Sequence, residues 1–257
     1  MGETIVIKCG GSVLNELSPS FFESLQAMYA QGKKIVLVHG GGPEIGQMLK
    51  KLNVTSEFVD GLRKTTKDVL EVVEMILAGK VNKLLVGLLQ QYGMPAVGIS
   101  GVDAHLLEAA PIDFTKLGYV GKVVKVNDTF LETLLRFGYI PVIAPLGVDE
   151  AGQTYNINAD TAAGAIAKAL NVQQLLFVTD VPGILQNGAV VERTTVAEIE
   201  QMIATGIITG GMIPKVKAAA AALSKELAEV MIVSGKTPFY ANGQLYGTSI
   251  RKEVGVY

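Results

Sequence analysis

The stretch KIVLVHGGGPEIGQMLKK, residues 34–51, decides the fold class of this 257-residue chain. Residues 34–38 are a short apolar run that is typical of a buried strand, and residues 44–51 have the pattern of a helix. Glycines lie between the two, and Pro43 suits the first helical turn, where no N–H is needed. A buried strand that passes through glycines into a helix is the repeating unit of α/β proteins.

The same alternation continues along the rest of the chain. Strands are predicted over residues 5–7, 96–99, 140–144, 175–178 and 229–233, and helices over 21–30, 69–78, 129–137, 161–170, 196–203 and 216–227. Continuous apolar strands between helices predict an α/β fold with a mostly parallel central sheet, covered on both faces. Residues 118–126 alternate and predict an antiparallel hairpin strand, and glycines and polar residues at 147–156 suggest a boundary.

Composition excludes several classes of protein. The formal net charge is −2 and no basic stripe is visible, so nucleic acid is not an expected partner. Although 49% of the residues are hydrophobic, charged residues interrupt every apolar run before the roughly 18 residues that a membrane span needs. The N-terminus lacks the pattern of a signal peptide. With one cysteine, Cys9, no internal disulfide is possible, and a cytoplasmic protein is expected.

Two glycine turns follow predicted strands, where ligands bind in open α/β sheets. In the first, Lys8 ends a strand and two glycines follow; in the second, residues 40–42 are all glycine. Glycine lets backbone N–H groups approach an anion closely, so both turns are candidate phosphate or carboxylate sites. His39 is expected to be a packed residue rather than a catalyst, and His105 a surface residue.

Three further segments have both a functional and a structural interpretation. Residues 60–65 place Arg63 in a glycine loop, where it either grips a carboxylate with two parallel hydrogen bonds or is a solvated surface residue. Residues 156–161 fit two interpretations, a helix N-cap or a ligand-binding segment. Residues 179–184 suit a nucleotide loop or an ordinary Pro-Gly turn.

Lys215 breaks a local rule. It lies near the start of the predicted helix that contains an alanine-rich run, where the helix dipole disfavours a cation. A bound polyphosphate would reverse the sign of the local field, so this residue is a candidate for a functional site.

Two nucleotide motifs are matched only loosely. The glycines within residues 40–46 approximate a dinucleotide fingerprint, and Asp60 follows about 20 residues later, which keeps an NAD-binding protein as a weak alternative. Residues 235–237 look like the end of a P-loop, but Val230 stands where a glycine is needed and Pro238 prevents the required helix. The P-loop is therefore rejected.

Together the motifs resemble the amino-acid kinase family over nearly the whole chain, most closely its members that phosphorylate N-acetyl-L-glutamate. The resemblance implies a three-layer αβα sandwich that forms a single domain over residues 1–257. Its N-terminal lobe, about residues 1–150, would bind the acyl substrate and dimerise, and its C-terminal lobe, about 151–257, would bind ATP. The motifs are Lys8 with Gly10 and Gly11, residues 38–43, 61–63, 156–160, 179–184, and 206–212 with Lys215.

The resemblance also implies roles for single residues. Lys8 and Lys215 would stabilise the transferring phosphoryl group, and Asp160 would position both lysines. Gly41 and Gly42 would offer N–H groups to the attacking carboxylate, while Arg63 and Asn156 would hold the α-carboxylate. The nucleotide site would comprise Gly10, Gly11, Asp180, Val181, Pro182, Gly183, Ile184, Leu185, Ile207, Ile208 and Thr209. Mg²⁺ would arrive with ATP, held mainly by its phosphates.

The implied reaction is ATP-dependent phosphorylation of the side-chain carboxylate of N-acetyl-L-glutamate, a step of arginine biosynthesis. N-acetylaminoadipate, one methylene longer, is the alternative substrate, in lysine biosynthesis. A non-catalytic nucleotide sensor is the alternative of another class, and the presence of Lys8, Lys215 and Asp160 together argues against it. Because the chain begins at its first predicted strand, it is expected to be a homodimer without arginine feedback.

Overall fold

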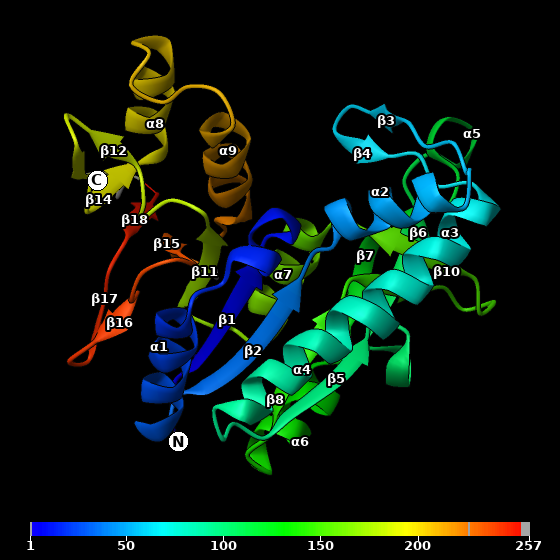
Figure 1. Ribbon diagram of the computed structural model, residues 1–257, viewed down its shortest axis with the longest axis horizontal. Coiled ribbons are helices and arrows are strands. Elements are labelled where there is room, and N and C mark those ends of the chain that lie inside the picture. The colour runs from blue at the N-terminus through cyan, green and yellow to red at the C-terminus, as the bar shows by residue number, and fades with distance from the viewer. Residues whose placement is uncertain (1, 226, 253–257) are drawn as a thin grey trace.

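A mostly parallel eight-stranded sheet forms the centre of the molecule (Figure 1). The structure is a computed structural model and describes residues 2–225 and 227–252. The strand order is β14-β18-β15-β11-β1-β2-β8-β5, and only the β15–β18 pair is antiparallel. The predicted mostly parallel sheet is therefore confirmed. Its strands are β1 (Thr4–Cys9), β2 (Lys34–His39), β5 (Ala96–Ser100), β8 (Ile140–Ala144), β11 (Gln174–Thr179), β14 (Arg193–Thr195), β15 (Glu229–Ser234) and β18 (Thr248–Arg251).

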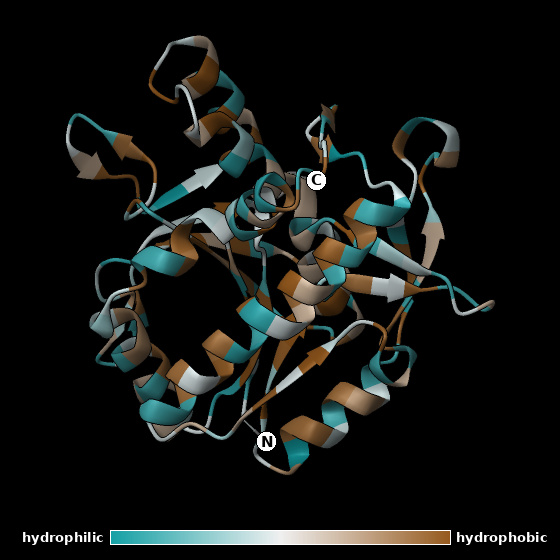
Figure 2. Ribbon diagram, turned by 45° about the vertical axis from the view of Figure 1, so that its right-hand side comes forward, coloured by the Kyte–Doolittle hydropathy of each residue, from teal (hydrophilic) through white to brown (hydrophobic). Residues whose placement is uncertain are grey.

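Helices cover both faces of this sheet. Successive residues of a strand point to opposite faces, and the apolar side chains on each face pack against a separate layer of helices. On β1, Ile5 and Ile7 pack with α1–α4, whereas Val6 packs with α6–α9. Figure 2 shows brown, hydrophobic stretches along the strands between helices that carry teal, hydrophilic residues. The long helices are α1 (Pro19–Ala30), α2 (Gly42–Lys51), α3 (Lys67–Glu74), α4 (Asn82–Gln91), α6 (Asp128–Arg136), α7 (Ala159–Ala169), α8 (Val196–Ala204) and α9 (Met212–Ala222).

A small four-stranded barrel and three hairpins complete the fold. The predicted hairpin strand is present as β7, which pairs antiparallel with β6. The barrel contains β6 (Leu107–Pro111), β7 (Val120–Val126), β9 (Leu146–Val148) and β10 (Thr154–Ile157). The hairpins are β3–β4 (Phe58–Val59, Leu62–Arg63), β12–β13 (Leu185–Gln186, Ala189–Val190) and β16–β17 (Tyr240–Ala241, Gln244–Leu245), and short helices are η1 (Gly11–Glu16), η3 (Asp103–His105) and α5 (Phe114–Leu117). Within the described residues, no helix is long and apolar enough to cross a membrane.

Two predicted helices have different limits in the structure. The helix predicted over residues 69–78 continues through a π-helical turn, η2 (Met75–Val81), into α4, because the apolar side chains of this segment pack into the core despite Gly79. The helix predicted over 216–227 begins earlier, after Gly211 at its N-cap, and ends where Leu223 becomes extended. Residue 226 of that prediction lies outside the described residues.

Candidate active site

Lys8 and Asp160 meet at the carboxyl end of β1. The alternation of β1 turns Lys8 to the same face as Val6, toward α7. Its Nζ forms an ion pair with Asp160 Oδ1 at 2.6 Å, and the two side chains are 15% and 27% exposed. Cys9 turns to the opposite face, where burial raises the pKa of its thiol to about 12. The cysteine beside the site is therefore a packed thiol rather than a nucleophile.

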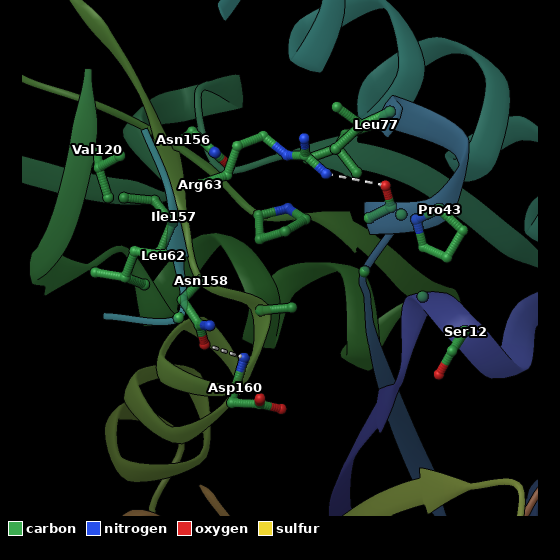
Figure 3. Close-up of a pocket in the computed structure, with 18 of the residues that line it drawn as sticks. Ser12, Pro43, Leu62, Arg63, Leu77, Val120, Asn156, Ile157, Asn158 and Asp160 are labelled. Atoms are coloured by element: carbon green, nitrogen blue, oxygen red, sulfur yellow. Dashed lines mark hydrogen bonds between the residues drawn. The ribbon is translucent and has the colours of Figure 1, made fainter. Parts of the chain in front are cut away.

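The start of α7 fixes the position of Asp160. Asn158 is the N-cap, and its Oδ1 accepts a hydrogen bond from the backbone N–H group of Asp160 at 2.9 Å (Figure 3). The same oxygen accepts a second hydrogen bond from the N–H group of Thr161 at 3.2 Å. This cap confirms the structural interpretation of the segment. It also holds the carboxylate of Asp160 in the first helical turn, where it reaches Lys8 across the sheet edge.

The two glycine turns touch each other. A Cβ atom on Gly11 would lie 2.7 Å from Gly41 N and 2.8 Å from Gly42 N, so only glycine allows this approach. A Cβ on Gly41 would lie 2.6 Å from Leu77 Cδ2, in the π-helical turn. Gly41 is the N-cap of α2, and the first N–H groups of a helix have no partner within it. The turn therefore presents N–H groups suited to an anion.

One cavity of about 290 Å³ is lined by all four predicted substrate-binding residues, by two of the predicted catalytic residues and by Gly11, which was predicted for ATP (Figure 3). The predicted residues that line it are Lys8, Gly11, Gly41, Gly42, Arg63, Asn156 and Asp160. They come from both halves of the chain, since Asn156 and Asp160 belong to the C-terminal lobe expected over about residues 151–257. The fold thus gathers cations, glycine N–H groups and one acid in a single small cavity.

Arg63 lies at the end of the β3–β4 hairpin and is tied to the glycine turn. Its Nη1 donates to Ser56 Oγ at 2.6 Å and its Nη2 donates to Gly42 O at 3.2 Å. Its guanidinium stacks on the ring of Phe58, 4.5 Å from the centroid, and burial lowers its pKa. Asn156 Nδ2 donates to Thr65 Oγ1 at 3.1 Å on the adjoining segment. Arg63 is therefore held in place by contacts rather than extended into solvent.

His39 is buried behind the second glycine turn, as predicted for a packed residue. Its Nδ1 lies 2.9 Å from Gly40 O, which makes this nitrogen the donor. Its Nε2 then accepts from Asn82 Nδ2 at 3.2 Å, and this amide also donates to Val142 O at 2.8 Å. Burial lowers the pKa of His39 to about 4, so the ring is neutral near pH 7. His105 is exposed, as expected.

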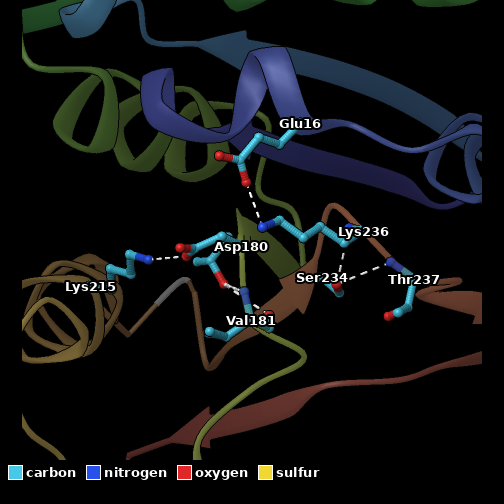
Figure 4. A network of polar contacts seen from close by, with 8 residues as sticks. Glu16, Asp180, Val181, Lys215, Ser234, Lys236 and Thr237 are labelled. Atoms are coloured by element: carbon cyan, nitrogen blue, oxygen red, sulfur yellow. Dashed lines mark hydrogen bonds and ion pairs between the residues drawn. The ribbon is translucent and has the colours of Figure 1, made fainter.

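Lys215 does not share the carboxylate of Asp160. In this structure its Nζ forms an ion pair with Asp180 (Figure 4), and the hydrogen bond lowers the pKa of that carboxyl group. The two lysines therefore pair with different carboxylates here, and the role expected for Asp160 toward Lys215 stays a prediction. The physical reason is that Asp180 directly follows β11 and lies within reach of the first turns of α9, whereas Asp160 reaches Lys8.

The other residues predicted for the nucleotide side have mixed surroundings. Ile184 and Ile208 are 1% and 2% exposed and belong to the apolar core, so their side chains are unavailable to a ligand. Leu185 and Ile207 are 44% and 38% exposed. Val181 is half-buried, Pro182 and Thr209 are exposed, Gly183 is buried, and Gly10 is half-buried beside Gly11. Apart from Gly11, none of these residues lines the cavity around Lys8.

Sequence reasoning missed much of the apolar wall of the cavity. Phe58 and Leu62 come from the β3–β4 hairpin, Leu77 from the π-helical turn, and Val120 from the barrel. These residues carry no local motif, because their contribution depends on distant elements meeting. No group of three or more His, Cys, Asp or Glu side chains suited to a metal occurs among the described residues.

Comparisons with known proteins show the family and the fold. Residues 3–234 match the Amino acid kinase family. The chain is 75% identical over 257 residues, all of both chains, to a protein of Geobacillus sp. (strain WCH70) named acetylglutamate kinase. Its fold matches the crystal structure of smu.665 from Streptococcus mutans UA159, at 35% identity and a TM-score of 0.85, over 98% of this chain and 100% of that one.

A more distant structure shares the fold alone. Carbamate kinase from Giardia lamblia bound to AMP-PNP is 18% identical, with a TM-score of 0.66 over 98% of this chain and 99% of that one. The family match spans most of the sequence, and four of the six motifs that suggested it contribute residues to the cavity around Lys8. The chain belongs to the amino acid kinase family.

Proposed function

We propose that this chain transfers the γ-phosphoryl group of ATP to the side-chain carboxylate of N-acetyl-L-glutamate, forming N-acetylglutamyl 5-phosphate in arginine biosynthesis. The observation that carries the proposal is the single cavity that joins Lys8, Asp160, the glycine turns, Arg63 and Asn156. The 75% identity to a protein named acetylglutamate kinase supports the choice of substrate.

The residues suit a reaction that needs charge neutralisation more than proton transfer. A carboxylate with a reference pKa of about 4.3 is already ionised near neutral pH, so no general base is required. The N–H groups of Gly41 and Gly42 would orient the attacking oxygen. Lys8 would neutralise charge that develops on the transferring phosphoryl group, with Asp160 holding its ammonium at 2.6 Å.

The opposite end of the substrate would be held by Arg63 and Asn156. Arg63 keeps the planar fork that suits a carboxylate, although two of its nitrogens already donate to Ser56 and Gly42. The hairpin and barrel residues Phe58, Leu62 and Val120 supply apolar contact for the carbon chain. The lining of the cavity therefore includes both charged or polar groups and apolar side chains.

ATP would bind toward β11 and β15, where Lys215 would exchange Asp180 for a phosphate. Mg²⁺ would supply further charge neutralisation, held mainly by the phosphates, since the described residues contain no acidic cluster that fits a resident ion. The acyl substrate would lie in the N-terminal lobe and the nucleotide in the C-terminal lobe, with Asn156 and Asp160 reaching the acyl cavity from the second lobe.

The chain is proposed to act as a cytoplasmic homodimer. Met75 and Leu84 are 57% and 47% exposed on the continuous η2–α4 segment, so this segment is the proposed contact with a second copy. Sedimentation velocity checks the assembly, and a monomer or a hexamer would contradict it.

Hydroxylamine trapping of the acyl phosphate tests the activity directly. The purified chain should convert N-acetylglutamate far better than glutamate, because a site built for a neutral amide offers no partner for an ammonium group. N-acetylaminoadipate and aspartate complete the series. Equal or better use of glutamate would refute the proposed substrate, and better use of N-acetylaminoadipate would move the enzyme to lysine biosynthesis.

A further inference from the structure

A second ion pair lies beside Lys215 and Asp180 and has no part in the chemistry described so far. Lys236 follows β15, and its Nζ forms an ion pair with Glu16 Oε2 at 2.5 Å (Figure 4). The segment around it was rejected as a P-loop, and in the structure β15 leads into a turn and the β16–β17 hairpin, not into a helix. The rejection holds, yet the lysine still lies at the ligand-binding end of the sheet.

Strand register places Lys236 at the nucleotide side. β1, β11 and β15 are consecutive parallel neighbours, and Thr179 at the end of β11 pairs with Ser234 at the end of β15. Asp180 and Gly235 therefore leave the sheet side by side. Lys236 is close enough to Asp180 for each charge to act on the other. Glu16, Lys236, Asp180 and Lys215 form a cluster in which two positive charges balance two negative ones.

The backbone of Lys236 is held firmly. Ser234 Oγ accepts hydrogen bonds from the N–H groups of Lys236 at 3.0 Å and Thr237 at 3.2 Å. Gly235 N–H donates to Thr179 O at 2.8 Å, and Gly235 O accepts from Ser18 N–H at 2.9 Å. A Cβ on Gly235 would lie 2.9 Å from both Val13 and Leu17, so the end of β15 packs directly under η1. The turn is fixed, and only the side chain of Lys236 is free to change partner.

Stability does not account for this arrangement. The side chains of Lys236 and Glu16 are 46% and 50% exposed, and exposed ion pairs contribute little to folding. A half-exposed ammonium on a rigid turn, paired with an equally exposed carboxylate, exchanges that partner at low cost for a more highly charged anion.

We propose that Lys236 is a further phosphate-binding residue of the nucleotide site, held on Glu16 until the polyphosphate of ATP takes the place of this carboxylate. The inference rests on the proposed function and extends it, since the triphosphate would meet Lys236 as well as Lys215. Glu16 belongs to η1, whose first residue, Gly11, touches the second glycine turn. The partner exchange would therefore occur on the same short helix that borders the acyl cavity.

Measurement of nucleotide binding in the absence of acyl substrate tests this role. Lys236→Gln and Glu16→Gln are a matched pair, because each removes one charge of the same ion pair. Calorimetric titration with Mg²⁺–ATP and with AMP is made for each protein, and thermal melting checks the fold. Lys236→Gln should weaken ATP binding by about tenfold or more, the usual effect of one charged hydrogen bond, and AMP binding much less. Glu16→Gln should leave ATP binding unchanged or tighter, because the lysine is released.

The opposite results overturn the inference. Equal weakening in both variants would show that the ion pair acts only through local structure, and unchanged binding in Lys236→Gln would show that the lysine makes no phosphate contact. Lys236→Arg keeps the charge and should bind ATP within about threefold of the original chain; failure of this rescue counts equally against the role. If the unaltered chain binds no ATP, the proposed function itself fails together with the inference.

Discussion

Replacement of Gly11 by alanine tests whether contact between the two glycine turns positions the reacting groups. The new Cβ would lie 2.7 Å from Gly41 N and 2.8 Å from Gly42 N. These are backbone atoms at the start of α2, so they cannot rotate away as the tip of a flexible side chain does. Reaching ordinary contact at 3.4 Å requires the turns to separate by about 0.7 Å.

The expected loss follows from this displacement. The affected N–H groups are those proposed to orient the attacking carboxylate, and a misplacement of about 1 Å costs roughly 100-fold in rate. A shift of about 0.7 Å predicts a fall in kcat of about 10- to 100-fold. Crowding of a packed region should also lower the free energy of unfolding by about 1–3 kcal/mol.

Hydroxylamine trapping measures kcat, and urea denaturation measures stability, for Gly11→Ala and for a matched Gly87→Ala control. Gly87 lies inside α4, and a Cβ there meets no atom within 4 Å. The control should keep its kcat and gain about 0.5–1 kcal/mol from the better helix former. A Gly11→Ala enzyme with kcat within twofold of the original and unchanged stability would refute the argument that this contact sets the geometry.

Three further predictions concern charged and titratable groups. Arg63→Lys keeps the positive charge but loses the planar guanidinium, so KM for the acyl substrate should rise by about 10- to 150-fold. KM for ATP should barely change. Steady-state kinetics that show a selective defect in KM for ATP would contradict the placement of the acyl substrate beside Arg63. Lys8→Ala and Lys215→Ala should each lower kcat by roughly 100-fold or more, because each removes charge stabilisation of the transition state, and single-turnover assays with near-normal rates would disprove these roles. His39 binds a proton more readily when unfolded, since burial lowers its folded pKa from 6.5 to about 4. Its contribution to stability is therefore complete above about pH 6.5 and should be lost as the pH falls toward 4, by about 3 kcal/mol in total. Urea titrations of the original chain and His39→Asn across this range should differ by that amount, and parallel profiles would rule it out.

Sequence patterns predict six of the eight strands of the central sheet, because these six are continuous apolar runs. The other two, β14 and β18, carry polar residues and were not predicted. The run at residues 34–38 becomes β2 with one added residue, His39, and the glycines after it form the turn into α2. Lys8 was identified because it ends such a strand, and its side relative to Val6 follows from alternation. These features are local, so one sequence contains enough information to find them.

Features that depend on distant contacts were not predictable in this way. The partner of Lys215 is decided by the reach of two flexible side chains on different elements, and its pairing with Asp180 was not predicted from the sequence. The barrel strand β10 has only four residues, too few for a clear alternation. The π-helical turn at Met75–Val81 follows from tertiary packing, whereas the predicted helix ended at residue 78.

The central place of β1 has a consequence for synthesis on the ribosome. Val6 pairs with Val36 on one side, which is made soon afterwards, but with Leu175 on the other, which emerges much later. Until then the growing chain carries an apolar strand with an open hydrogen-bonding edge, the kind of template that recruits other chains. Lys8 lies near the end of that strand, so the candidate active site is completed only after most of the chain has been made. Slow translation between residues 40 and 175 should therefore favour aggregation more than slow translation near the C-terminus.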